Sequence, residues 1–197
     1  LRDLKRFCTE QGIPLKVYSY KDEFGMSLDE MLKKLNEKPC RVCGVFRRYL
    51  LNKKSKDYDK IATGHNLDDE AQSVMMNLLK ANMTIAARTG PKTGIREMKG
   101  LTQRVKPFYF CTQKEVAAYA LLNNLEIKFV ECPNMKGSFR EFVQESLNDI
   151  QLEFPDAKKR IVTNFLANKR KLMQDRKIKE IANCENCGEP SERGSCK

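Results

Sequence analysis

Long hydrophobic runs are absent from this sequence, and none approaches the roughly 20 residues that a membrane-spanning helix needs. No secretory signal is visible, so we expect the protein in the reducing cytosol and away from membranes. Paired cysteines in that compartment bind metal more often than they form disulfides. Histidine is scarce too: His65 is the only one. Because a lone histidine is more often a packing residue than a general base, we assign it no catalytic role.

Basic residues are plentiful by contrast. The 197 residues carry 37 lysines and arginines against 26 aspartates and glutamates, a net charge of +11. The hydrophobic share of 41% is enough for one ordinary domain with a small appendage. This excess charge suits a phosphate-rich partner, although a merely soluble basic protein has the same composition. Much of the charge forms a C-terminal basic strip of Lys158, Lys159, Arg160, Lys169, Arg170, Lys171, Arg176, Lys177 and Lys179.

The periodicity of apolar residues predicts strands that alternate with helices. Strands are expected at 16–20, 60–63, 105–108 and 127–130, and helices at 1–11, 28–37, 44–54, 67–78, 112–123, 138–151 and 155–177. Pro39 is expected to end one helix and to leave Cys40 on a loop. This alternation implies an α/β fold with a parallel sheet, whose ligands bind beyond the carboxyl ends of the strands.

Six of the eight cysteines form two triplets, each a C-x-x-C with a distant third member. The first comprises Cys40, Cys43 and Cys132. Three thiolates can hold an iron–sulfur cluster with one open iron, or a zinc ion with a fourth non-cysteine ligand. Two of the cysteines can instead form a redox dithiol. They can also be unlinked buried cysteines. Spacing alone leaves these alternatives open.

The second triplet, Cys184, Cys187 and Cys196, lies in a polar tail with Gly188 and Gly194. Its spacing is typical of a zinc ribbon whose fourth ligand follows Lys197, and the alternative is an unstructured tail. The remaining cysteines, Cys8 and Cys111, receive no function.

A polar turn connects the expected strand at 60–63 to the next helix. Gly64 lets a backbone approach a ligand closely, and the helix N-terminus after Asn66 favours an anion such as phosphate. Asp68 and Asp69 occupy the first turn, where favourable interaction with the helix dipole also explains an acid.

These motifs occur in one order along the chain: Pro39-Cys40-x-x-Cys43-Gly44, Arg47-Arg48, Ala62-Thr63-Gly64-His65-Asn66-Leu67-Asp68-Asp69-Glu70-Ala71, Glu131-Cys132-Pro133 and the terminal cysteines. Together they resemble the tRNA 2-thiouridine synthetases of the TtcA/TtuA superfamily over nearly the whole chain. The run from Cys43 to Arg48 is similar to the archaeal and eukaryotic cytoplasmic tRNA 2-thiolation proteins, which act on the wobble uridine.

The resemblance implies a Rossmann-like ATP pyrophosphatase domain of the adenine nucleotide alpha hydrolase (PP-loop) type. It implies a 4Fe–4S cluster on Cys40, Cys43 and Cys132, ATP contacts at Gly64 and Arg47, and a catalytic aspartate at Asp69. The expected reaction is adenylation of the uridine C2 carbonyl with Mg²⁺ and ATP, then displacement of AMP by sulfur. The sulfur donor is sulfide or a ubiquitin-like carrier protein, tRNA is the substrate, and a homodimer is possible.

The family's Ser-Gly-Gly-x-Asp-Ser pyrophosphate loop and its N-terminal zinc finger are absent, and both belong upstream of Leu1. Because the chain begins without methionine and stops inside a cysteine motif, we expect it to be part of a longer protein. The expected domains are the C-terminal portion of a PP-loop domain at 1–154, a basic helical region at 155–182 and a truncated zinc ribbon at 183–197.

Three alternative functions remain. The chain could be a non-catalytic, zinc-stabilised RNA-binding module, or it could thiolate a T-loop uridine instead of the wobble uridine. An ATP pyrophosphatase acting on a small molecule is the third, and the basic strip argues against it.

Overall fold

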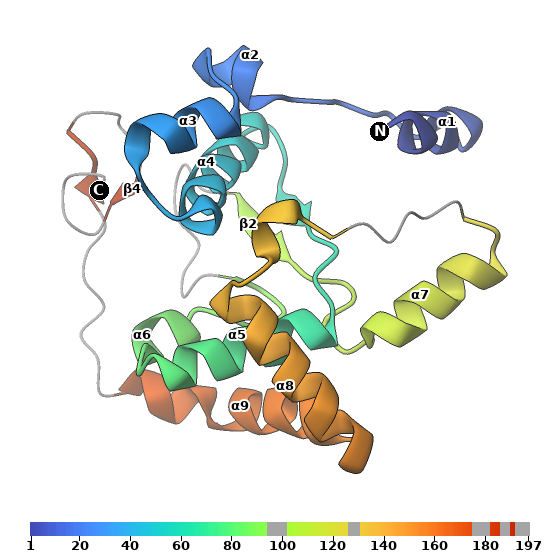
Figure 1. Ribbon diagram of the computed structural model, residues 1–197, viewed down its shortest axis with the longest axis vertical. Helices are drawn as coiled ribbons and strands as arrows, with labels where there is room; N and C mark the ends of the chain where they lie inside the picture. Colours follow the sequence, from blue (N-terminus) through green and yellow to red (C-terminus); the bar gives the residue numbers. More distant parts are fainter. Residues whose placement is uncertain (94–101, 126–130, 175–181, 186–189, 192–197) are drawn as a thin grey trace. The chain divides into compact units, whose positions relative to one another are not determined.

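The computed structural model describes residues 1–93, 102–125, 131–174, 182–185 and 190–191 (Figure 1). The chain forms two compact units, each assembled from two separate stretches of sequence. Unit 1 comprises residues 1–53 and 116–136, and unit 2 comprises residues 54–115 and 137–197. These units do not test the predicted domain boundaries at 154 and 182, which stay predictions.

Unit 1 is helical in its described part. Its helices are α1 (Arg2–Glu10), α2 (Tyr20–Phe24), α3 (Leu28–Leu35), nearly all of α4 (Pro39–Lys54), most of α7 (Gln113–Leu122) and the short 3₁₀ helix η1 (Pro133–Met135). A capping box opens α3: the Ser27 hydroxyl accepts from the Glu30 N–H, and the Glu30 carboxylate accepts from the Ser27 N–H. The helix predicted at 28–37 is confirmed over Leu28–Leu35.

Two sequence predictions in unit 1 are wrong. No strand forms at residues 16–20; instead, Ser19 caps α2 by accepting a hydrogen bond from the Asp22 N–H at 3.1 Å, and Tyr20 is the first residue of that helix. Pro39 does not leave Cys40 on a loop, because proline suits the first position of a helix and α4 begins there. Cys40 and Cys43 are therefore helical residues one turn apart.

Unit 2 contains the parallel strand pair that the α/β prediction required. Strands β1 (Lys60–Ala62) and β2 (Gln103–Val105) pair in register, Lys60 with Gln103 and Ala62 with Val105. A parallel pair needs a long crossover, and here it runs through α5 (Leu67–Leu79) and α6 (Met83–Ala86).

The predictions of two further strands, at 105–108 and 127–130, have different outcomes. The strand expected at 105–108 is wrong beyond Val105, because the next residues turn, with the Tyr109 N–H bonded to the Lys106 carbonyl. The strand expected at 127–130 lies outside the described residues.

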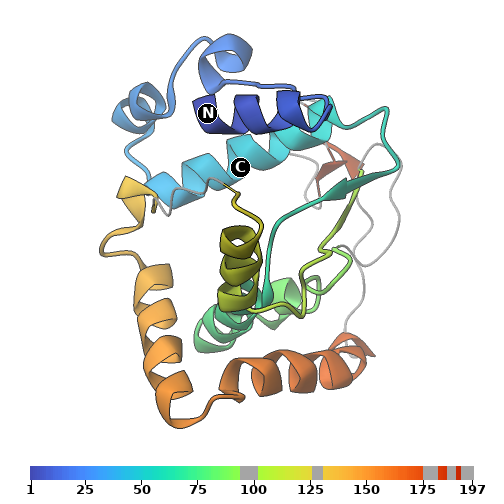
Figure 2. The same ribbon diagram turned by 90° about the vertical axis from the view of Figure 1, so that its right-hand side faces the viewer.

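The core of unit 2 forms between α5 and two C-terminal helices, α8 (Phe139–Glu153) and α9 (Ala157–Gln174), which follow one another directly (Figure 2). Apolar residues at helical spacing on α5 face this contact, as the sequence pattern predicted. The central buried cluster consists of Leu67, Ala71, Tyr109, Val143, Leu147 and Val162. This packing fixes the N-terminus of α5, where the acidic residues lie.

The C-terminal tail forms a small antiparallel pair, β3 (Ala182–Asn183) with β4 (Pro190–Ser191). Cys184 follows β3 directly and is buried. Cys187 and Cys196, the other members of the expected zinc ribbon, lie outside the described residues. In the part of the chain that the structure describes, no helix has both the length and the apolar character to cross a membrane.

Candidate functional site

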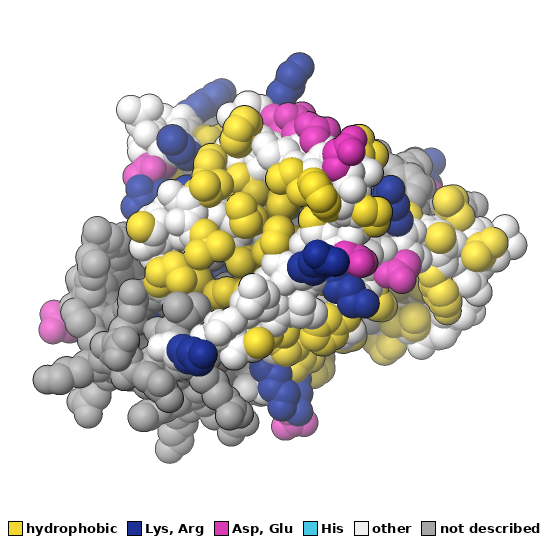
Figure 3. All heavy atoms as spheres, turned by 90° about the horizontal axis from the view of Figure 1, so that it is seen from below, with side chains coloured by type: hydrophobic (Ala, Val, Ile, Leu, Met, Phe, Trp, Pro, Cys, Tyr) yellow, Lys and Arg dark blue, Asp and Glu magenta, His cyan; other side chains and the backbone are white. Residues whose placement is uncertain are grey.

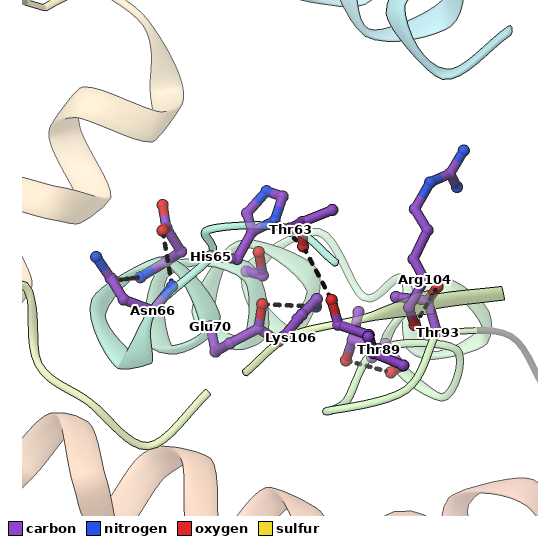
Figure 4. A network of polar contacts seen from close by, with 12 residues as sticks. Thr63, His65, Asn66, Glu70, Thr89, Thr93, Arg104 and Lys106 are labelled. Atoms are coloured by element: carbon purple, nitrogen blue, oxygen red, sulfur yellow. Dashed lines mark hydrogen bonds and ion pairs between the residues drawn. The ribbon is translucent and has the colours of Figure 1, made fainter. Parts of the chain in front are cut away.

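The turn between β1 and α5 is held by a reciprocal cap. The Asn66 side-chain oxygen accepts from the Asp69 N–H, and the Asp69 carboxylate accepts from the Asn66 N–H, both at 3.1 Å (Figure 4). Two otherwise unpaired groups at the helix start are satisfied in this way. Asp69 therefore has a structural role in addition to any chemical one.

Arg140 of α8 occupies the second oxygen of Asp69. Its Nη2 donates to Asp69 Oδ1 at 2.6 Å, and its Nε donates to Gln72 Oε1 at 2.9 Å. Both partners of the ion pair remain partly open to solvent, at 28% exposure for the Asp69 side chain and 39% for Arg140. A positively charged group is thus paired with the expected catalytic aspartate at an accessible place.

Asp68 is held differently, by a buried network. Lys158 of α9 donates to Asp68 Oδ1 at 2.5 Å and to Asn148 Oδ1 at 2.6 Å, while the Gln113 N–H donates to Asp68 Oδ2 at 2.7 Å. The Lys158 side chain is only 3% exposed. The network ties α5 to α9 and to the start of α7, so Asp68 is a packing residue.

Glu70 forms the third pairing of this acidic turn. Lys106, which follows β2, donates to Glu70 Oε1 at 2.6 Å, and both side chains are buried (Figure 4). In the described part of the chain, Glu70 Oε2 and the buried Tyr109 hydroxyl have no hydrogen-bond partner. Burial raises the pKa of Glu70 above its ordinary value, opposed by the charge of Lys106. Burial also raises the pKa of Tyr109, and the Glu70 charge adds to this effect.

Gly64 and His65 lie between the strand and the cap. A methyl group added at Gly64 would meet nothing within 4 Å, so the space beside this backbone is open. His65 is exposed, and its Nδ1 lies 2.9 Å from the Thr63 hydroxyl (Figure 4). Open space at a helix N-terminus is what a bound anion requires.

The first cysteine triplet lies wholly in unit 1. Cys40 and Cys43 lie on the first turns of α4, and Cys132 precedes η1. The Cys40 sulfur is 3.9 Å from the backbone carbonyl of Asn134, so the segment after Cys132 contacts the start of α4. All three thiols are free, with Cys40 and Cys132 exposed and Cys43 half-buried.

Cys43 has a polar neighbour that the sequence did not indicate. The Tyr20 hydroxyl lies 3.6 Å from the Cys43 sulfur and 3.3 Å from the Cys43 carbonyl oxygen. Burial, and then the contact with Cys43, raise the pKa of Tyr20 to about 12. The phenol therefore stays protonated at neutral pH.

The chemistry of the triplet fits a thiophilic centre such as an iron–sulfur cluster, because its donors are three thiols, two on one turn of helix and one beside a contacting segment. The sulfurs are not closed into a ligand cage: among the described residues, no group of three or more His, Cys, Asp or Glu side chains is arranged to hold a metal ion. The two segments therefore touch, but their cysteine sulfurs are not arranged as the ligands of a metal ion.

The expected basic strip is not uniformly a surface feature. Lys158 is buried in the Asp68 network and Lys169 is half-buried, where burial lowers its pKa and its Nζ donates to the Thr89 carbonyl. Lys159, Arg160 and Lys171 are exposed, whereas Arg176, Lys177 and Lys179 lie outside the described residues. On the face seen in Figure 3, lysines and arginines stand apart between exposed apolar side chains.

Sequence reasoning missed the roles of Arg140, Lys106 and Tyr20, and it took Lys158 for a charge of the basic strip. Arg140 lies 71 positions from Asp69, and Lys158 lies 90 positions from Asp68. Pairings at such separations leave no local pattern in a single sequence. Tyr20 was assigned to a strand that does not form.

No protein-family model matches the chain. Curated relatives do match. The "tRNA-5-methyluridine(54) 2-sulfurtransferase" of Thermus thermophilus is 34% identical over 192 residues, which are 96% of this chain and 59% of the relative. The "Cytoplasmic tRNA 2-thiolation protein 1" of Arabidopsis thaliana is 33% identical over 201 residues, covering 100% of this chain and 55% of the relative.

A solved structure matches as well. The U34-tRNA thiolase NcsA from Methanococcus maripaludis, solved with its 4Fe–4S cluster, superposes with a TM-score of 0.78 at 32% identity. The match covers 95% of this chain and 60% of that one. The fold is therefore an α/β fold of the kind found in tRNA thiolases.

Sequence and structure agree on one class of relatives: over nearly its whole length, the chain is similar to tRNA 2-thiolation sulfurtransferases. It spans 59% and 61% of the length of two such relatives, those of Thermus thermophilus and Pyrococcus horikoshii. It spans 58% of the length of a "Probable sulfurtransferase" of Methanocaldococcus jannaschii.

Proposed function

We propose that this protein is an ATP-dependent tRNA sulfurtransferase that converts a uridine, at the wobble position, to 2-thiouridine. The observation that carries the proposal is the likeness, at 32% identity and a TM-score of 0.78, to a tRNA thiolase solved with a 4Fe–4S cluster. The free thiols of Cys40, Cys43 and Cys132 within one compact unit support it.

Cys40, Cys43 and Cys132 would hold the 4Fe–4S cluster as thiolates. When bound, such a cluster supplies an open iron that can keep a sulfur ligand deprotonated and reactive. The helix fixes the spacing of Cys40 and Cys43, and the contact between Cys40 and the Asn134 carbonyl keeps the Cys132 segment beside them. The sulfur donor would be sulfide or a ubiquitin-like carrier protein.

The nucleotide would bind over the open backbone at Gly64, with its phosphates toward the N-terminus of α5. Arg47, an exposed residue of α4, is the proposed second ATP contact, and Mg²⁺ would neutralise the phosphates. A complete Rossmann-like PP-loop domain would supply the remaining contacts. The reaction would adenylate the C2 carbonyl oxygen of uridine and release AMP when sulfur attacks.

Asp69 is the proposed catalytic carboxylate, because it is the acid of the turn that has an accessible ion pair. Arg140 would hold its carboxylate in one orientation in the absence of substrate. A negatively charged substrate phosphate attracts the same guanidinium, so substrate binding would free Asp69 Oδ1 to act as acid or base or to hold Mg²⁺.

The tRNA would bind through phosphate contacts that give affinity without sequence choice. Exposed Lys159, Arg160 and Lys171, within the proposed basic region at 155–182, are available for this. Cys184, Cys187 and Cys196 would fold the tail at 183–197 around Zn²⁺. We further propose a cytoplasmic location, as in the name of the Arabidopsis relative, and a homodimer.

Anaerobic purification and a nucleoside assay test the proposal. The protein should contain iron and acid-labile sulfide in equal amounts, and it should form 2-thiouridine in tRNA supplied with ATP, Mg²⁺ and sulfide. Cys132→Ala should abolish thiolation and leave tRNA binding nearly intact, whereas the control Cys111→Ala should keep both. Thiolation retained in Cys132→Ala rules out the proposed ligand set.

One specific observation favours a second target. The Thermus relative is named for 5-methyluridine 54, whereas the thiolase from Methanococcus is named for U34. Mapping the thiolated nucleoside by mass spectrometry of tRNA fragments separates the two positions. Zinc alone in the purified protein, with no thiolation, would instead support the RNA-binding module.

A further inference from the structure

The surroundings of Cys43 contain a hydrogen-bond donor that a ligand sulfur can use. The Tyr20 hydroxyl lies 3.6 Å from the Cys43 sulfur and 3.3 Å from the carbonyl oxygen of the same residue. Tyr20 comes from α2, a different helix from the one that carries Cys43. The contact therefore depends on how the two helices pack within unit 1.

An aromatic cluster fixes the ring of Tyr20 at this place. Its ring centroid lies 6.1 Å from that of Phe24 and 6.5 Å from that of Phe46, and Phe24 and Phe46 stack edge to face at 4.9 Å. Tyr49 joins the cluster through Phe24 at 5.7 Å. Aromatic pairs at these separations are attractive, so the hydroxyl is held rather than free to swing away.

The direction of the hydrogen bond depends on the state of Cys43. A thiol can donate to the phenol oxygen while the phenol donates to the Cys43 carbonyl. A thiolate has no proton and can only accept, and a bond to a charged acceptor is roughly twice as strong as a neutral one. A ligand sulfur bound to iron is an acceptor of this kind, so the Tyr20 hydroxyl at 3.6 Å is placed to donate to it.

We propose that Tyr20 is a positioning residue that donates a hydrogen bond to the Cys43 thiolate when that sulfur is a cluster ligand. This inference rests on the proposed function, because it takes Cys43 as an iron ligand. Hydrogen bonds to ligand sulfurs withdraw charge from them and stabilise the reduced form, which raises the reduction potential of an iron–sulfur cluster.

The test compares the anaerobically purified wild-type protein with Tyr20→Phe and Tyr49→Phe. Both variants lose one hydroxyl from the same aromatic cluster and keep the ring, but only Tyr20 contacts Cys43. The readouts are iron and sulfide content, the reduction midpoint from a titration followed by electron paramagnetic resonance, and thiolation of tRNA.

Tyr20→Phe should bind the same amount of iron and sulfide as the wild type, with a more negative midpoint. A lost charge-assisted bond corresponds to about a tenfold change in the ratio of reduced to oxidised cluster, or about 59 mV for one electron. Tyr49→Phe should match the wild type. An unchanged midpoint in Tyr20→Phe overturns the inference and leaves the proposed function standing.

A second substitution covers the case in which Tyr20→Phe does not retain the cluster. Incorporating 3-fluorotyrosine at position 20 keeps the hydroxyl and makes it a stronger donor, so the midpoint should become more positive than that of the wild type. No positive change overturns the inference. Wild-type protein that holds no iron at all refutes the proposed function, and this inference with it. Thiolation by such iron-free protein would show that the cluster, and not the hydrogen bond from Tyr20, is the failed premise.

Discussion

Replacing Lys158 with methionine should strongly destabilise the protein. The Nζ atom of Lys158 lies 2.5 Å from Asp68 Oδ1 and 2.6 Å from Asn148 Oδ1, and the lysine side chain is 3% exposed. Methionine keeps much of the side-chain length without the charge. Among the described residues, Lys158→Met therefore leaves the buried Asp68 carboxylate with the N–H of Gln113 as its remaining donor.

The expected cost follows from that unpaired charge. Removing one partner of a buried ion pair costs about 3–5 kcal/mol. For a chain of this length, 1 kcal/mol lowers Tm by about 2–4 °C, so Tm should fall by about 6–20 °C. Lys159→Met at the exposed neighbouring position should change stability by no more than about 0.5 kcal/mol.

Thermal unfolding followed by circular dichroism measures these differences. Adding Asp68→Asn to Lys158→Met removes the stranded charge, so the double variant should recover part of the lost stability. If Lys158→Met and Lys159→Met have the same Tm, the buried pair does not stabilise the fold and the reasoning about the α5–α9 contact is refuted.

Other predictions concern the cap, the open glycine, the accessible pair and the buried acid. Ser27→Ala should cost about 1 kcal/mol by removing the cap of α3, and an unchanged urea midpoint would contradict it. Gly64→Ala should leave Tm unchanged, because its methyl group meets nothing within 4 Å, while raising the KM for ATP; a fall in Tm with an unchanged KM would argue for a structural glycine. Arg140→Ala should cost no more than about 1 kcal/mol, since its pair with Asp69 is partly exposed, yet should lower kcat for thiolation; an unaltered kcat would remove Arg140 from the site. Burial raises the folded-state pKa of Glu70, so its contribution to stability is greatest below the ordinary carboxyl pKa and is lost as pH rises through the raised value. The stability of wild type relative to Glu70→Gln should therefore decline from about pH 4.5 upward, and a difference that is constant with pH would contradict the raised pKa.

Local patterns predicted the helices of this fold well. The capping boxes at Ser27 and Asn66 join residues only three positions apart, so their partners lie close together in the sequence, and both boxes are present. The strand at residues 16–20 failed because alternation over five residues competed with a Ser19 cap, which starts a helix at Tyr20. The prediction that Pro39 leaves Cys40 on a loop failed for a related reason: proline is compatible with a helix start as well as with a loop.

The candidate site was predictable only to the extent that its members are close in sequence. Gly64 and Asp69 follow from the turn between a strand and a helix, and Cys40 with Cys43 follows from their spacing. The counter-ions of the turn come from distant elements, and sequence alone treated Lys158 as one charge in a surface strip. Its burial depends on Asp68 lying opposite it, which only the packing of α5 on α9 provides.

Three consecutive acids begin α5, and the structure separates their roles by the cation that each one meets. Asp68 and Glu70 are paired with buried lysines, so their charges are already compensated inside the core. Asp69 shares its position in the first turn but is paired with Arg140, whose side chain is 39% exposed. A dissolved ion or substrate phosphate competes for an exposed guanidinium far more readily than for a buried ammonium, because the exposed group keeps its access to solvent. The availability of a carboxylate for chemistry in this turn is therefore decided by the partner on α8, and not by the acid itself.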